Sequence, residues 1–452
     1  MAVLKSINPF DPSRIINYPQ VSDMNLAVQL GRSHASFSTY RHSSFDERAR
    51  LMTQVALILR EGSGEFAEVI TREMGKPISE AAAEVKKCAW VCEYYAANAA
   101  LFLEEKVVET EAEESRVIFE SLGTILAIMP WNFPFWQVFR FAAPALMAGN
   151  TVLLKHASNV QACAGAIETI FKEAGFEEGV FQNLAIGSDR IASVIASEYV
   201  KAVSLTGSEE AGVAVATEAG KHLKKCVLEL GGSNAFVVLN DANRELTLNL
   251  AIPARMQNAG QSCIAAKRFI LESWIAEDFI PLLVSRVEQL VVGDPMDQNT
   301  QVGPLVSKKQ AMEVEEQVSK SVSMGAKLLL GGERKGAFYL PTILTGVKPG
   351  MPVFDEEVFG PVFAVMEASS PEDALELSNR SNFGLGMQLF TSSEQSAELF
   401  IRGAEEGSVF INNMVKSDPR LPFGGTKRSG YGRELSEEGI KEFVNIKTIW
   451  ID

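Results

Sequence analysis

The sequence has few histidines and cysteines, and their arrangement excludes several kinds of site. Four histidines and five cysteines occur in 452 residues, without HExxH, CxxC or CxxCH spacing. We therefore expect no metal site and no disulfide framework. Reduced thiols are typical of the cytoplasm, where we expect this protein to act.

Basic charge and uninterrupted apolar runs are also scarce. The net charge of -15 argues against an extended nucleic-acid or anionic-membrane surface, because both require a basic stripe. Residues 122–148 carry one charge and are long enough for a membrane span, but three prolines interrupt them. We interpret them as a buried strand, a loop and a helix. The first nine residues lack the zones of a signal peptide.

What is present indicates a folded α/β protein. The hydrophobic content of 46%, the charged content of 22% and the 34 glycines are ordinary globular values, and the length predicts two or three domains. Strands and helices alternate from residue 123 to about 205, and a second alternating set runs from 234 to about 416. This alternation predicts parallel βαβ units in two α/β domains.

The segments before residue 122 have different patterns. A capping box at Ser44 and helical spacing predict a helix over 44–61, and a second helix is expected over 79–103. Cys88 and Cys92 lie one turn apart on it, which indicates a core face. Residues 104–120 alternate without a helical period and predict a projecting antiparallel hairpin of the kind that often pairs with another subunit.

Two residues, Glu229 and Cys263, carry the clearest chemical signal. Glu229 ends an apolar strand just before a glycine pair, and Cys263 follows a small, polar stretch that leaves a thiol accessible. A thiolate attacks a carbonyl, and a carboxylate activates the water that releases the product. The alternative is that Cys263 is a small buried hydrophobe and Glu229 a solvated strand end.

Asn132 adds a possible oxyanion donor. It lies in Pro130-Trp131-Asn132-Phe133-Pro134, between a buried strand and a helix, so its amide is presented at the carboxyl end of a strand. With a backbone N–H it can stabilise a developing oxyanion. Alone, Asn132 is equally consistent with a turn.

Together these motifs resemble the NAD(P)-dependent aldehyde dehydrogenase superfamily. PWNFP, LELGG and GQSC occur in the order and spacing typical of that family, and further matches extend over nearly the whole chain. These further matches are Lys155 after TVLL, Thr206-Gly207-Ser208, Glu356–Pro361, Asn412 in FIN, and Pro422–Gly425 with Lys427–Gly430.

The resemblance implies an α/β fold with three parts. These are a Rossmann-like cofactor-binding domain over 1–103 and 122–231, an α/β catalytic domain over 232–428, and a small β oligomerisation arm over 104–121 and 429–452. The family's arms join subunits, so we expect a homodimer or homotetramer. Cys263 matches the nucleophile, Glu229 the base, and Asn132 with the Cys263 N–H the oxyanion hole.

The resemblance also implies the cofactor positions, which are Trp131, Lys155, Ser158, Gly207, Ser208, Leu230, Glu357 and Phe359. Family members that prefer NAD commonly carry an acidic residue where this chain has Ser158. A hydroxyl donates to a 2′-phosphate that a carboxylate would repel, which favours NADP, with NAD as the alternative. Ser158 is otherwise interpreted as the cap of the following helix.

The phosphate-binding signal departs from the usual pattern. The chain has no GxGxxG loop, and Ala185–Asp189 keeps one glycine where many family members have G-x-G. We expect the pyrophosphate to lie at the helix that begins near Ser208.

Two further residues suggest a carboxylated substrate. Arg140 lies eight residues after Asn132 on the following helix, about two turns towards the substrate channel; the alternative is a surface ion pair. Arg140 and Ser417 match the carboxylate-binding residues of succinate-semialdehyde dehydrogenases, and the text around them resembles a bacterial branch. Gln257 departs from the arginine of other branches, which favours broader acceptance of other semialdehydes or uncharged aldehydes.

Two rival functions stay open. An acylating dehydrogenase passes its acyl group to coenzyme A, but Glu229 disfavours it because hydrolysis needs a base. A non-catalytic binding protein on the same scaffold is disfavoured because Cys263, Glu229 and Asn132 are all present. The expected partner is therefore a small aldehyde, with no nucleic acid and no membrane.

Overall fold

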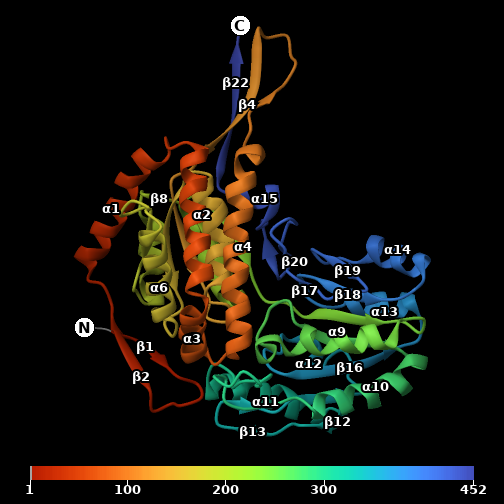
Figure 1. The fold of residues 1–452 in the computed structure, drawn as a ribbon. Helices are drawn as coiled ribbons and strands as arrows, with labels where there is room; N and C mark the ends of the chain where they lie inside the picture. Colours follow the sequence, from red (N-terminus) through yellow and green to blue (C-terminus); the bar gives the residue numbers. More distant parts are fainter. Residues whose placement is uncertain (1–2) are drawn as a thin grey trace.

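The computed structural model describes residues 3–452. Met1 and Ala2, which begin the predicted range 1–103 and the stretch without signal-peptide zones, lie outside the described residues. Two α/β bodies lie beside each other, and a narrow β arm projects from one of them (Figure 1). The predicted fold class is confirmed.

The first body contains a six-stranded sheet in the order β21-β9-β8-β5-β6-β7. All of its neighbouring strands are parallel except β21 against β9. Every residue of β5 and β6 is buried, as expected for strands covered on both faces. The strands are β5 Thr124–Met129, β6 Thr151–His156, β7 Phe181–Asn183, β8 Val200–Thr206, β9 Lys225–Glu229 and β21 Gly430–Tyr431.

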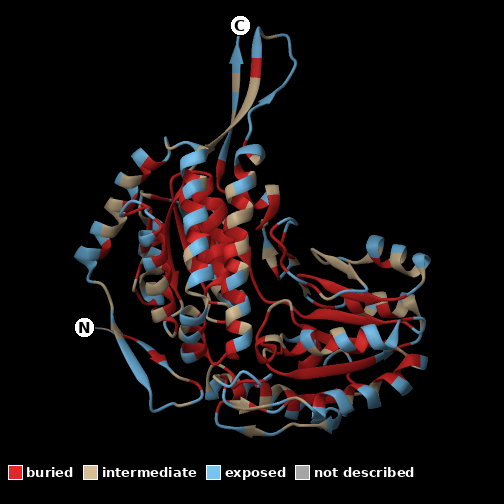
Figure 2. Cartoon of the chain, in the orientation of Figure 1, coloured by how far each residue is buried: buried red, intermediate tan, exposed pale blue. Residues whose placement is uncertain are grey.

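Helices cover this sheet, and their buried faces are turned towards it (Figures 1 and 2). The N-cap half of the capping box predicted at Ser44 is confirmed, because the Ser44 Oγ accepts from the Glu47 N–H at 3.1 Å. Cys88 and Cys92 are fully buried, as predicted. The helices are α1 Asp23–Tyr40, α2 Phe45–Glu61, α3 Ser63–Met74, α4 Ile78–Phe102, α5 Trp136–Met147, α6 Gln161–Glu173, α7 Ile191–Ala196 and α8 Glu209–Lys221.

Residues 122–148 form β5, a loop and α5, which confirms their interpretation. Within the described range 3–452, no helix combines the length and apolar character that crossing a membrane requires.

The second body is built on a seven-stranded sheet in the order β12-β15-β16-β11-β10-β18-β19. Only β12 runs antiparallel to its neighbour. The strands are β10 Asn234–Val238, β11 Ala266–Glu272, β12 Lys327–Leu330, β15 Thr342–Thr345, β16 Val362–Ala368, β18 Met387–Phe390 and β19 Val409–Ile411. The main helices are α9 Arg244–Met256, α10 Ser273–Glu288, α11 Lys308–Ser323, α13 Pro371–Asn379 and α14 Glu394–Gly403.

The arm is an antiparallel sheet of β3 Lys106–Val107, β4 Glu114–Ser121 and β22 Val444–Ile451, which confirms the predicted hairpin. Its predicted second segment, 429–452, divides differently. β21 joins the six-stranded sheet, and α15 Ser436–Lys441 packs against α4 and α5. Within that segment, β22 pairs with β4 and belongs to the arm. The chain between β21 and β22 does not, because its apolar residues are buried in the core of the first body.

Candidate active site

Two cavities meet at Cys263, where the two bodies face each other. Cavity 1 lies between α4, α5 and the loop before Cys263, and its lining includes Lys87, Trp136, Arg140, Gln257, Ser417 and Phe423. Cavity 2 lies against the carboxyl ends of β5, β8 and β9, and its lining includes Trp131, Asn132, Gly207, Ser208, Leu230, Glu357 and Phe359. Cys263 lines both cavities, so a group in either one can reach its sulfur.

The loop that carries Cys263 makes an unusual turn. Asn258, Ala259 and Gly260 have φ values of 55°, 53° and 76°, a left-handed conformation that is costly for residues other than glycine. The Glu80 carboxylate accepts from the Asn258 N–H at 2.7 Å, and the Asn258 Nδ2 donates to the Asn132 carbonyl at 2.8 Å. These bonds hold the turn and attach it to the Asn132 loop.

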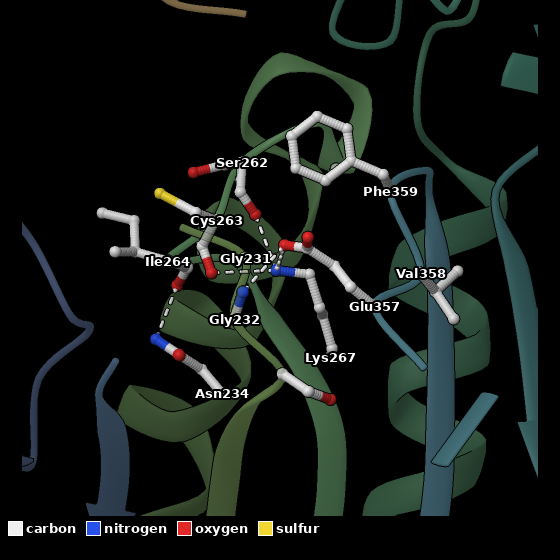
Figure 3. Close-up of polar contacts among 12 residues, drawn as sticks. Gly231, Gly232, Asn234, Ser262, Cys263, Ile264, Lys267, Glu357, Val358 and Phe359 are labelled. Carbon is white, nitrogen blue, oxygen red and sulfur yellow. Dashed lines mark hydrogen bonds and ion pairs between the residues drawn. The ribbon is translucent and has the colours of Figure 1, made fainter. Parts of the chain in front are cut away.

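A buried lysine supports Cys263 from below. The Lys267 Nζ donates to the carbonyls of Ser262 and Cys263 at 2.7 and 2.9 Å and lies 3.1 Å from Glu357 Oε1 (Figure 3). The thiol points away from this cluster in the close-up. Sequence reasoning missed Lys267, because nothing in its position four residues after Cys263 marks it as a partner.

Cys263 is a thiol at neutral pH in this structure. Burial raises its pKa to about 11, although the nearby charges of Arg140 and Lys267 act in the opposite direction. Its side chain is half-buried and lines two cavities, so the interpretation of Cys263 as a small buried hydrophobe does not hold.

We expect alkylation of Cys263 by iodoacetamide to be slow at pH 7 and to accelerate about tenfold for each pH unit up to about pH 10, because only the thiolate reacts. Peptide mass spectrometry of the labelled protein without cofactor measures this, and Cys263→Ala gives the background from other cysteines. A rate that levels off near neutral pH would contradict the raised pKa.

The amide of Asn132 is held in one orientation. Its Oδ1 accepts from the Gln137 Nε2 at 3.0 Å, and its Nδ2 donates to the Gln261 carbonyl at 3.1 Å. The NH2 group is therefore directed at the loop of Cys263, and one of its hydrogens stays available for an oxyanion. A residue that only formed a turn would not need its side-chain amide fixed by both of these hydrogen bonds. Gln137, whose part is to orient the amide, was not predicted.

Glu229 ends β9, as predicted, but it is not solvated. Its side chain is 2% exposed, and neither carboxyl oxygen has a hydrogen-bond partner among the described residues. Burial and the negative charge of Glu434 raise its pKa well above the usual range. The carboxyl packs against Gly424, where an added Cβ would lie 2.8 Å from Glu229 Oε1. Glu229 is not among the described residues that line cavity 1 or cavity 2.

Arg140 does lie beside Cys263 and Ser417 in cavity 1, but it already has an acidic partner. Its guanidinium forms a buried ion pair with Glu434, donates to Thr206 Oγ1 at 3.2 Å and lies 4.6 Å from the ring centre of Phe423. The alternative of a surface ion pair is wrong, because both side chains are at most 4% exposed. No sequence signal had singled out Glu434.

The predicted cofactor residues fall into two groups. Trp131, Gly207, Ser208, Leu230, Glu357 and Phe359 line cavity 2. As predicted, a helix begins at this point, since the Ser208 side chain caps α8. Glu357 Oε1 also accepts from the Gly232 N–H at 3.1 Å, at the point where the chain passes from β9 to β10.

Lys155 and Ser158 lie apart from that group, on β6 and the loop that follows it. Lys155 is buried, and desolvation lowers its pKa. Ser158 is exposed and does not cap α6, whose N-cap is Val160. The helix-cap interpretation of Ser158 is therefore wrong.

Comparison with known proteins was made for the whole chain. A model of the aldehyde dehydrogenase family matches residues 2–449. A probable succinate-semialdehyde dehydrogenase [NADP(+)] of Synechocystis sp. is 47% identical over 451 residues, which are 99% of each chain. A succinate semialdehyde dehydrogenase [NAD(P)+] of Escherichia coli is 45% identical over 99% of this chain and 97% of its own.

A solved structure is similar throughout. The succinic semialdehyde dehydrogenase from Streptococcus pyogenes in complex with NADP+ superposes with a TM-score of 0.97 at 40% identity, over 99% of each chain.

Proposed function

Because the chain belongs to the aldehyde dehydrogenase family, we propose that it oxidises succinate semialdehyde, or a similar short aldehyde, to the carboxylic acid with NADP. The observation that carries this proposal is the position of Cys263 between two cavities, one of which holds basic side chains and Ser417. The names of the relatives from Synechocystis and Streptococcus pyogenes support the same substrate and cofactor.

The residues divide the chemistry among them. The Cys263 thiol first loses its proton to solvent. The resulting thiolate attacks the aldehyde carbon, and the Asn132 NH2 with the Cys263 N–H stabilises the oxyanion. NADP, when bound, accepts the hydride. The acyl group then remains on Cys263 as a thioester, and Glu229 activates the water that hydrolyses it. Because Glu229 lines neither cavity here, its side chain has to rotate for this step.

The cofactor is held by Trp131, Lys155, Ser158, Gly207, Ser208, Leu230, Glu357 and Phe359 in this proposal. The buried ammonium of Lys155 supports the binding of NADP, because no carboxylate among the described residues forms an ion pair with this ammonium. A buried unpaired cation is costly, and a 2′-phosphate would compensate it. NADP is therefore the preferred cofactor and NAD the weaker one.

Ser158→Glu should move cofactor preference towards NAD. A carboxylate beside Lys155 neutralises the ammonium and repels a 2′-phosphate, so the ratio of kcat/KM for NADP over NAD should fall about 10- to 100-fold. Ser158→Ala, which removes the hydroxyl without adding charge, is the matched control and should change the ratio less. Unchanged selectivity in Ser158→Glu would show that Ser158 does not face the cofactor.

The proposal also covers assembly, the division into domains and the cellular location. The exposed apolar residues of the arm, such as Val107 and Ile446, support assembly into a homodimer or homotetramer. We assign 1–103 and 122–231 to cofactor binding, 232–428 to catalysis, and β3, β4 and β22 to assembly. The protein acts in the cytoplasm, on a small-molecule aldehyde.

A second candidate function is a broad-specificity aldehyde dehydrogenase, and Gln257 favours it, because an uncharged side chain lines cavity 1 at that position. A panel of aldehydes with and without a distal carboxylate, followed by the absorbance of reduced NADP, tests both candidates. We expect succinate semialdehyde to have the highest kcat/KM. Equal values for butanal and succinate semialdehyde would favour the broad enzyme, and no turnover of any aldehyde would favour a binding protein.

A further inference from the structure

Lys87 brings a second basic group to cavity 1, from α4. Its Nζ donates to Ser417 Oγ at 2.8 Å and lies 4.1 Å from the ring centre of Trp136. Both of these neighbours line the cavity with it. Because Ser417 uses an oxygen lone pair to accept this bond, its own O–H hydrogen stays free to donate.

The acidic groups around Lys87 are already engaged. Glu80, which lines the same cavity two turns earlier on α4, accepts from the Asn258 N–H. The Glu84 Oε1, one turn earlier on α4, accepts from the Phe135 and Trp136 N–H groups at 2.9 and 3.0 Å, and its other oxygen pairs with Lys76. Asp418 forms a bidentate pair with Arg420, at 2.8 Å for both bonds. Among the described residues, no carboxylate lies within ion-pair distance of Lys87.

Arg140, the other basic residue of this cavity, differs in this respect. Its buried ion pair with Glu434 compensates much of its charge before any ligand binds. The Lys87 side chain is half-buried and has no carboxylate partner among the described residues, and partial desolvation of a cation is costly unless an anion accompanies it. Gln257 lines the same cavity and adds no charge.

We propose that Lys87 determines substrate specificity by binding the distal carboxylate of the aldehyde together with the Ser417 hydroxyl. This inference rests on the proposed function and makes it more specific, because it assigns the main carboxylate charge to Lys87 on α4. Arg140 then holds Glu434 and closes the wall of the cavity near Glu229. The ligand class is a short aldehyde with a terminal carboxylate.

Lys87→Met tests the inference, because methionine keeps the length and removes the charge. We expect the KM for succinate semialdehyde to rise about 10- to 100-fold, as for loss of a charge-assisted hydrogen bond, and the KM for butanal to change far less. The inhibition constant of succinate should rise in parallel. Lys87→Arg should restore most of the affinity.

Lys86→Met is the matched control, because the neighbouring Lys86 is exposed and should leave both substrates unaffected. Equal losses on both substrates in Lys87→Met would overturn the inference and leave the proposed function intact. A wild-type enzyme that oxidises butanal but not succinate semialdehyde would overturn both.

The wild-type enzyme gives a second test that does not depend on a folded variant. Burial and the charge of Arg140 from α5 lower the pKa of Lys87 to about 8, against the opposing charges of Cys88, Glu84 and Asp418. The ratio of kcat/KM for succinate semialdehyde over butanal should therefore be constant at low pH and fall as pH rises above about 8. A ratio constant up to about pH 10 would contradict the role of Lys87.

Discussion

Cys263→Ala should abolish aldehyde oxidation, with a loss on the order of 10⁴-fold or more, because no other group can form the covalent intermediate. The other four cysteines do not replace it. Cys88, Cys92 and Cys163 are fully buried, and Cys226 lies on β9, where its sulfur contacts the Tyr431 hydroxyl at 3.4 Å.

Cofactor binding should survive this change. The Cys263 side chain is one member of the lining of cavity 2, and the remaining predicted contacts come from other residues. Titration with NADP, followed by fluorescence, should give a dissociation constant close to that of the wild type. Cys226→Ala is the matched control and should keep its turnover. Substantial turnover in Cys263→Ala would contradict the assignment of the nucleophile.

Glu229→Gln should slow hydrolysis of the thioester about 10²- to 10⁴-fold while hydride transfer continues, because it removes the general base but not the nucleophile. An acyl-enzyme should then accumulate and be visible by intact mass after one turnover. Its expected signature is a burst of reduced NADP equal to the enzyme concentration, followed by a slow steady rate.

The rate of thioester hydrolysis should also depend on pH, because Glu229 acts as a base only when it is deprotonated. Burial and Glu434 raise the pKa of Glu229, so Glu229 is protonated below that pKa and becomes a base as pH rises through it. Hydrolysis in the wild type should therefore accelerate with pH over a range well above the usual carboxyl pKa, and Glu229→Gln should lose this rise. A variant with impaired hydride transfer and no adduct would indicate a different base.

Local patterns predicted the fold well, and they also singled out the residues that we propose as reacting groups. The alternation of apolar strands and helices is a short-range signal, and it anticipated β5, β6, β8 and the helices between them. Asn132 and Cys263 were recognisable because each follows a buried element in a short polar stretch. The structure brings both to cavity 2.

The contacts of the basic residues in cavity 1 could not be predicted, because their partners come from distant parts of the chain. Lys87 meets Ser417 across 330 positions, and Arg140 meets Glu434 across nearly 300. A lysine on a helix and a glutamate in a loop look like ordinary surface residues in a sequence. Only the packing of α4 and α5 against the chain that follows β19 shows that Lys87 meets Ser417 and that Arg140 and Glu434 are buried together.

The account's central claim is hydrolytic oxidation of succinate semialdehyde with NADP. Product analysis with purified protein, NADP and succinate semialdehyde, in the absence of coenzyme A, tests it most directly. We predict one equivalent each of succinate and reduced NADP for every equivalent of aldehyde consumed. A requirement for coenzyme A with formation of its succinyl thioester, or the absence of any reduced NADP, would contradict it.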